Sequence, residues 1–150
     1  MGQGMGHAAV TDEPAYVLEE QVGHLLRRAH QRATAVFLQR IGEAQLTPTQ
    51  WAALAKLADT GGASQNHLGR LTAMDPATIQ GVIRRLVARK LIETAGDPTD
   101  RRRSVLRLTP AGGALVARLQ ANAREVSRAT LEPLGDSERA ELLRLLKAIC

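Results

Sequence analysis

The most informative part of the sequence is the stretch SQNHLGRLTAMDPATIQGVIRRLVARKLIETAGDPTDRRRSVLRLTPAG, residues 64–112. Within it, Asp75–Lys90 has the pattern of an amphipathic helix, because apolar residues recur three and four positions apart. These residues are Ile79, Val82, Ile83 and Leu86. Asp75 before Pro76 suits a helix start, since a short acceptor side chain caps free N–H groups and proline fits the first turn. The opposite face is polar and basic, with Thr78, Gln80, Arg84, Arg85 and Arg89.

A basic hairpin is expected directly after this helix. Two short runs with the composition of strands, Leu91–Thr94 and Val105–Thr109, flank the loop GDPTDRRRS, residues 96–104. The loop combines turn-forming residues with three consecutive arginines. We therefore expect two paired strands joined by a loop with a positively charged tip.

A short helix is expected before the amphipathic one. Ser64 can cap it, and it should end near Leu71, with a turn at Thr72–Met74. Leu68 and Leu71 can then pack against the apolar face of the next helix. A short helix, a turn, a polar-faced helix and a basic hairpin make a winged helix-turn-helix. That arrangement places the polar-faced helix in the major groove of DNA and the hairpin loop on the adjacent backbone or minor groove.

Four further segments have helical patterns, and the scarcity of aromatic residues also favours a mainly α protein of the α+β class. In chain order the segments are Ala15–Gly42, a segment starting at Thr47 and stopped by Gly61 and Gly62, Pro110 to about Thr130, and a last helix from Asp136 or Ser137. The second of these should be well capped, because Thr47, Pro48 and Gln50 stand where a capping box needs them.

The chain therefore divides into four parts. We expect a flexible segment at 1–14, a dimerisation helix at 15–45, a winged helix-turn-helix DNA-binding domain at 46–110 and C-terminal dimerisation helices at 111–150. The first helix is long for a chain of this size, and the last two hold more leucines than one small core needs. We interpret both chain ends as a bundle that joins two subunits; the alternative is a bundle within one chain.

Composition and charge favour a polyanionic partner. The formal net charge is +5, and the cations concentrate in the polar-faced helix and the hairpin loop. The one cysteine, Cys150, excludes an intramolecular disulfide and is a weak candidate for redox sensing. The sequence has no membrane-length apolar run, and its first residues lack the apolar core of a signal peptide. We expect a cytoplasmic protein with no membrane partner.

The order of these elements resembles the MarR family of bacterial transcriptional regulators, over about Tyr16 to Ile149. The most specific portions are LTPTQWAALAKLA, residues 46–58, and DPTDRRRSVLRLTPAG, residues 97–112. In the second portion the family's wing signature is matched by Asp100, Arg101, Arg102, Leu108, Thr109 and Gly112. The resemblance implies a two-fold homodimer that represses transcription from palindromic operators on double-stranded DNA. It also implies release of that DNA by a small effector, often an aromatic acid or a phenol.

Candidate DNA contacts fall on three segments. Base edges should be read from the N-terminal half of the polar-faced helix, by Pro76, Ala77, Thr78 and Gln80, with Arg84 on a guanine or a phosphate. Phosphates suit the start of the preceding helix, at Ser64, Gln65 and Asn66. In the loop, Arg102 is the first candidate for the minor groove, followed by Arg101 and with Arg103 beside them. Asp100 should pair with a nearby arginine and hold the loop. Arg85 and Arg89 are either simply solvated or functional.

Candidate effector contacts follow from the family's pocket, which lies between the dimer helices and the winged domain, below the first helix. An anionic aromatic ligand needs a cation and an apolar or aromatic wall. His24, Arg28 and Gln31 share one side of the first helix, whereas His30 falls among apolar residues and is expected to face inward. Tyr16 and Trp51 could supply the wall. The alternative for each residue is an ordinary exposed or hydrogen-bonded side chain.

Enzyme functions find no support in the sequence. It has no G-x-S-x-G, no phosphate-binding loop and no H-E-x-x-H, and its four histidines do not make a compact metal set. We expect no catalytic residues, no metal and no cofactor. Two other functions stay open beside a ligand-responsive repressor: an architectural DNA-binding protein without an effector, and a winged helix used for protein interaction.

Overall fold

The computed structural model describes residues 13–150 and confirms a mainly helical fold with one small sheet. Along this part the elements are η1 (Leu18–Glu20), α1 (Val22–Ile41), η2 (Gly42–Ala44), α2 (Pro48–Thr60), α3 (Gln65–Leu71), α4 (Pro76–Ala88), β1 (Ile92–Gly96), β2 (Ser104–Leu108), α5 (Pro110–Thr130) and α6 (Asp136–Ile149). The expected flexible segment, residues 1–14, lies almost wholly outside the described residues. None of the helices in the described part is long and apolar enough to cross a membrane.

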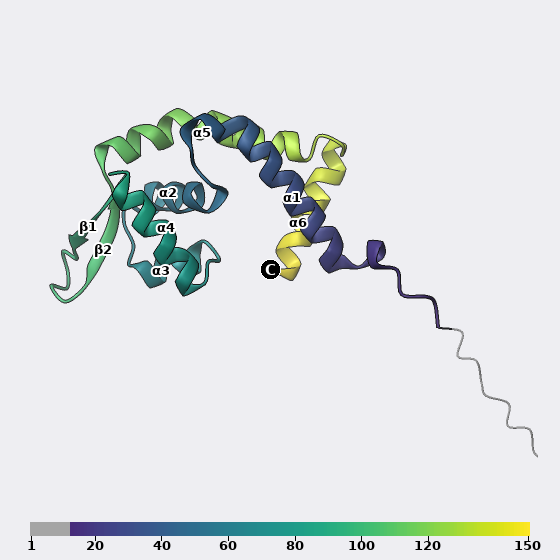
Figure 1. Cartoon of the computed structure of the whole chain (residues 1–150), viewed down its shortest axis with the longest axis horizontal. Coiled ribbons are helices and arrows are strands. Elements are labelled where there is room, and N and C mark those ends of the chain that lie inside the picture. Colours follow the sequence, from purple (N-terminus) through teal and green to yellow (C-terminus); the bar gives the residue numbers. More distant parts are fainter. Residues whose placement is uncertain (1–12) are drawn as a thin grey trace, which may run out of the picture.

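The fold is an arch whose top is formed by α5 and α1 packed together (Figure 1). At one end of the arch lie α2, α3, α4 and the hairpin of β1 and β2. At the other end lie α6 and the beginning of α1 (Figure 1). The arrangement separates the winged lobe from α6 and the beginning of α1.

The hydrophobic core lies mainly in the winged lobe and reaches up into α1 and α5. Ile79, Val82, Ile83 and Leu86 are buried on one face of α4, as their spacing predicts. Phe37 and Ile41 extend the core onto α1, whereas α6 has no buried residue at all. The winged lobe therefore shares one core with α1 and α5, and α6 lies outside it.

Helix termini confirm several expectations drawn from short motifs. Thr47 and Gln50 form a complete capping box at the start of α2, and Gly61 ends that helix in a left-handed conformation. Ser64, Asp75 and Thr109 each accept a backbone N–H three residues ahead. The sequence therefore locates these helix starts to within one residue.

The expected start of the first helix was wrong. Instead of running from Ala15, α1 begins at Val22, because Gln21 is extended and η1 forms a separate turn before it. The Gln21 side-chain amide donates to the Val17 carbonyl over 2.8 Å and stabilises that turn. The apolar spacing continues through the break, so periodicity alone does not reveal it.

Two smaller expectations also need correction. Leu68 is fully buried as expected, but Leu71 is 38% exposed, because α3 ends at this residue and the chain turns at once toward α4. The strands are shifted by one or two residues from their expected positions and pair in an antiparallel register from Ile92–Leu108 to Gly96–Ser104. The pairing of β2 with Ala63, through two hydrogen bonds of 2.8 and 3.0 Å, attaches the hairpin to the segment before α3.

The beginning of α5 lies against the end of α4. The Thr109 hydroxyl donates to the Lys90 carbonyl over 2.7 Å, and the Thr109 N–H donates to the Leu91 carbonyl over 3.1 Å. Gly112 lies directly over Leu91, where a Cβ atom would overlap the Leu91 carbonyl group. This close approach requires glycine.

Replacing Gly112 with alanine should therefore destabilise the protein by about 1–3 kcal/mol, the usual cost of forcing an extra group into a packed site. Gly113→Ala is the matched control, because a Cβ there meets nothing within 4 Å. It should stabilise the helix by about 0.5–1 kcal/mol. Chemical denaturation of both variants measures the difference; equal effects would contradict the close packing at Gly112.

Candidate nucleic-acid interface

The two sides of α4 differ sharply in burial. The face opposite its buried residues is exposed and includes the candidates Pro76, Ala77, Thr78, Gln80 and Arg84. This helix and the hairpin both belong to the same end of the arch (Figure 1). The structure therefore places the predicted reading helix and the predicted wing in one lobe, with the reading face open.

The first turn of α4 is fixed by Asp75. One carboxylate oxygen accepts the Thr78 N–H over 2.9 Å, and the other accepts the Thr78 hydroxyl over 2.7 Å. The backbone hydrogen bond, followed by the hydroxyl, lowers the pKa of Asp75 below its usual value. Because its hydroxyl hydrogen is engaged by Asp75, Thr78 offers a ligand its methyl group and the hydroxyl oxygen as an acceptor, and no free donor.

The start of α3 lies beside the start of α4. Asn66 and Pro76 line one groove of about 310 Å³ together with Arg70 and Met74. The Ser64 oxygen accepts the His67 N–H over 3.2 Å, which leaves the Ser64 hydroxyl hydrogen free to donate elsewhere. Gln65 and Asn66 are exposed. The three candidates on this segment thus stand together at the start of α3, beside the first turn of α4.

The hairpin loop is shaped by its two aspartates. Asp97 accepts both the N–H and the hydroxyl of Thr99, at 2.8 and 2.7 Å, and these bonds lower the pKa of Asp97. Asp100 accepts the Arg102 N–H over 2.9 Å and lies 3.6 Å from the Arg103 guanidinium. The expectation that Asp100 pairs with an arginine and holds the loop is confirmed.

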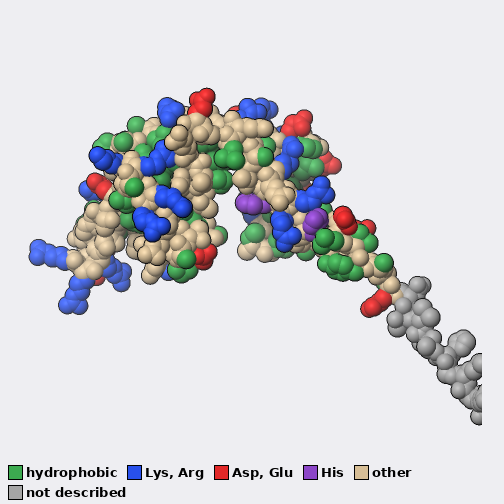
Figure 2. Space-filling view, in the orientation of Figure 1, with side chains coloured by type: hydrophobic (Ala, Val, Ile, Leu, Met, Phe, Trp, Pro, Cys, Tyr) green, Lys and Arg blue, Asp and Glu red, His purple; other side chains and the backbone are tan. Residues whose placement is uncertain are grey.

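Positive charge is concentrated at the free end of this hairpin (Figure 2). Arg101, Arg102 and Arg103 are all exposed there, and only Arg103 has an ion-pair partner within the described residues. Farther down the hairpin, Arg107 pairs with Glu93 on the opposite strand over 2.8 Å. The loop therefore presents Arg101 and Arg102 as its unpaired cations.

The sequence analysis did not select Gly81, on α4, and left Arg89, directly after α4, as either solvated or functional. Gly81 lies one turn after Ala77 on the outward face, and a Cβ there would meet nothing within 4 Å, so the fold itself does not require glycine. A glycine inside an amphipathic helix was the available signal. Arg89 donates to the carbonyls of Ala44 and Gln45, a contact between distant segments that no local pattern announces.

The candidate effector residues are not gathered in a single chain. His24, Arg28 and Gln31 share one side of α1, but Tyr16 precedes η1 and is 77% exposed. The beginning of α1 lies at the end of the arch away from α2 (Figure 1). Trp51 lies on α2, half-buried against the core. His30 is exposed rather than inward-facing, because the first half of α1 extends beyond the core.

Beside these residues lies an apolar groove of about 360 Å³ between α1 and α6. It is lined by Val22, Leu25, Leu26, Ala29, Leu142, Leu145, Leu146, Ala148 and Ile149. Leu25, Leu145 and Ile149 are each about half exposed or more. Within residues 13–150, no three His, Cys, Asp or Glu side chains gather as metal ligands.

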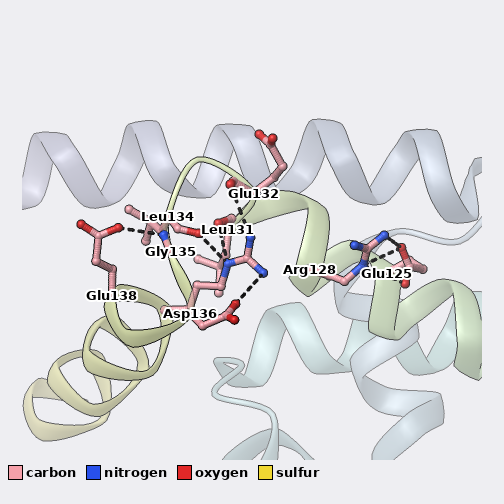
Figure 3. A network of polar contacts seen from close by, with 9 residues as sticks. Glu125, Arg128, Leu131, Glu132, Leu134, Gly135, Asp136 and Glu138 are labelled. Atoms are coloured by element: carbon pink, nitrogen blue, oxygen red, sulfur yellow. Dashed lines mark hydrogen bonds and ion pairs between the residues drawn. The ribbon is translucent and has the colours of Figure 1, made fainter.

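The turn between α5 and α6 is held by Arg139. Figure 3 shows the residues of this turn, among them Leu131, Leu134 and Gly135. The Arg139 guanidinium donates to the carbonyls of Leu131 and Leu134 over 3.1 and 2.8 Å. Glu138 accepts the Gly135 N–H over 2.8 Å at the start of α6. These contacts set the direction in which α6 leaves the arch.

Comparison with known proteins adds the following similarities. A sequence model of the MarR family matches residues 44–103. The HTH-type transcriptional repressor NicR of Pseudomonas putida is 43% identical over 140 residues, which are 93% of this chain and 89% of that protein. The structure of a probable transcriptional regulator from Pseudomonas aeruginosa is 50% identical, with a TM-score of 0.83 over 89% of this chain and 100% of that one. BpsR of Bordetella bronchiseptica, whose structure addresses the regulation of its DNA binding by 6-hydroxynicotinic acid, is 43% identical. It matches with a TM-score of 0.84 and covers 90% of this chain and 96% of that one.

The cap on α4 yields a prediction about pH. The lowered pKa of Asp75 means that its charged form is stabilised by folding, so its contribution is present at neutral pH and is lost as pH falls through the folded-state pKa. Asp75→Ala should lower the melting temperature at pH 7, and the difference from wild type should shrink toward pH 3. Thermal unfolding across this range measures it.

Asp75→Asn is the control for this prediction, because asparagine still caps a helix but does not titrate. The difference in melting temperature between Asp75→Asn and Asp75→Ala should therefore be the same at pH 7 and at pH 3. A difference between wild type and Asp75→Ala that stays constant from pH 7 to pH 3 would contradict the role of the carboxylate.

Proposed function

The chain belongs to the MarR family of transcriptional regulators and is not an enzyme, and from this premise we propose that it is a ligand-responsive repressor. The proposed protein binds a palindromic operator as a homodimer. A small aromatic acid or phenol releases it from that DNA.

The observation that carries the proposal is the pairing of an open, polar α4 face with an arginine-tipped hairpin in one lobe. A helix inserted in the major groove and a guanidinium in the adjacent minor groove complement each other, because the first reads base edges and the second reads electrostatic potential. Cations at the tip also find phosphates on both sides of the minor groove.

We assign the individual roles as follows. Gln80 is suited to a bidentate pair with adenine, and Ala77 and the Thr78 methyl group are suited to a thymine methyl. Arg84 lies farther along the same helix, within reach of a guanine or a phosphate. Arg102 enters the minor groove, and Arg101 supports it from the neighbouring position. The phosphate backbone of the DNA is contacted by Ser64, Gln65 and Asn66.

The dimer is proposed from the chain ends. Apolar residues of the early part of α1 and of α6 are exposed in one chain and line a shared groove. Exposed apolar residues gathered in one groove mark a partner site. A second copy of the chain, related by a two-fold axis, would cover this surface with its own. In this division, residues 15–45 and 111–150 join the subunits, while residues 46–110 bind DNA.

The effector class is supported by relatives and by α1. DNA binding by BpsR is regulated by 6-hydroxynicotinic acid, an aromatic acid. In this chain α1 offers His24 and Arg28 one turn apart, a pair that suits a carboxylate, with Gln31 farther along the same side. We propose that these residues, with His30, Tyr16 and Trp51 from either subunit, surround the effector.

Two substitutions test the DNA roles. Arg102→Ala should weaken binding to a duplex selected from a randomised pool and to a random duplex alike, because it removes a contact to shape and charge. Gln80→Ala should weaken only the selected duplex, by about tenfold, as expected for a lost bidentate base contact. Fluorescence anisotropy titrations on both duplexes measure the losses. Equal losses for the two variants on both duplexes would contradict the assignment.

Thermal unfolding tests the effector. Aromatic carboxylates such as 6-hydroxynicotinic acid should raise the melting temperature, because a ligand that binds only the folded state stabilises it. The same ligand should weaken binding to the selected duplex. Arg28→Gln should reduce the thermal shift, whereas Arg118→Gln on α5 serves as the control for charge. A screen in which no aromatic acid or phenol shifts unfolding would favour the effector-independent function.

A further inference from the structure

Arg89, the residue that caps the C-terminal end of α4, is hydrogen-bonded to a distant part of the chain. The Arg89 guanidinium donates to the Gln45 carbonyl over 2.9 Å and to the Ala44 carbonyl over 2.8 Å. These two carbonyls belong to the linker between α1 and α2. The two terminal nitrogens of the Arg89 side chain thus connect the end of α4 to the linker that follows α1. The beginning of α1 lines the apolar groove shared with α6.

The linker that accepts these bonds is itself fixed. Leu46, directly after Gln45, is 2% exposed, and the capping box of Thr47 and Gln50 starts α2 immediately beyond it. Gln45 has a left-handed backbone, with φ 52° and ψ 38°. Arg89 therefore binds a turn of fixed conformation, so the contact can hold the end of α4 in a fixed position relative to α1 and α2.

The other contacts of α4 are of a different kind. Its core face is apolar and close-packed, which sets the position of the helix without a hydrogen bond. At the far side of its last turn, Thr109 holds the carbonyls of Lys90 and Leu91. Arg89 completes this support with a forked pair of directional bonds, the geometry that suits a guanidinium.

The position of Arg89 gives it leverage over the reading residues. Ala77 lies 12 residues earlier on the same helix, which is about 18 Å at 1.5 Å per residue. A tilt of about 10° about the last turn would move the first turn by about 3 Å. Hydrogen bonds to base edges tolerate only about 0.5 Å.

We propose that Arg89 is a positioning residue of the DNA-reading surface: it sets the tilt of α4 by clamping it to the α1–α2 linker and does not itself contact DNA. This inference rests on the proposed function of a sequence-specific DNA-binding regulator. A residue of this kind affects recognition of the correct sequence and leaves the general attraction to DNA unchanged.

The test compares Arg89→Gln, Arg89→Lys and the control Arg118→Gln, each first shown to be folded by its circular dichroism spectrum and melting curve. Dissociation constants are measured at several salt concentrations, on a duplex selected by the wild type from a randomised pool and on a random duplex. Arg118 is an exposed arginine of α5, so its variant removes the same charge elsewhere.

Arg89→Gln should bind the selected duplex at least tenfold more weakly, with unchanged binding to the random duplex and an unchanged salt slope. Arg89→Lys should fall between it and the wild type, since an ammonium can reach a carbonyl but lacks the fork, and it carries the test if the glutamine variant does not fold. Arg118→Gln should match the wild type.

The proposal is overturned if Arg89→Gln weakens both duplexes equally and lowers the salt slope by about 0.9 for each lost phosphate contact, the sign of a direct contact. It is also overturned if binding to the selected duplex does not change. A wild type that does not prefer the selected duplex over the random one would instead refute the proposed function.

Discussion

The packing of α1 along α5 is the contact on which the rest of the structure depends. Phe37 and Ile41 of α1 and Val116 and Leu119 of α5 are buried in the common core. Polar contacts secure the pair along its length, since the Arg32 guanidinium binds the carbonyls at the end of α5 and Asn122 binds the Arg40 carbonyl. The packed pair of α1 and α5 has the winged lobe at one end and α6 at the other (Figure 1).

The hydrogen bonds of three carboxylates determine which arginines of the winged lobe stay unpaired. Asp75, Asp97 and Asp100 all accept hydrogen bonds from the chain within three residues of themselves. Those bonds shape the helix start and the hairpin loop and leave Arg101 and Arg102 as unpaired cations at the tip. The acids therefore organise a surface whose outward charge is positive, which is the condition for approaching a polyanion.

Sequence reasoning predicted most of the fold because its signals are local. Thr47, Ser64, Asp75 and Thr109 mark helix starts through hydrogen bonds that span three residues, and the loop of residues 96–104 contains its own turn chemistry. It failed where the outcome depends on distant segments. The Arg89 side chain is exposed, and its hydrogen bonds join residues 44 and 45 positions apart, which no local pattern indicates. The apolar spacing before Val22 conceals the break at Gln21.

In the proposed complex, two copies of this chain present two arginine-tipped lobes to one double helix. Light scattering coupled to size-exclusion chromatography, in low salt with a palindromic duplex selected from a randomised pool, measures the mass of that complex. We expect a mass that exceeds that of the duplex by two chains of 16.2 kDa each. A complex with a single chain per duplex, or the absence of any complex, would contradict it.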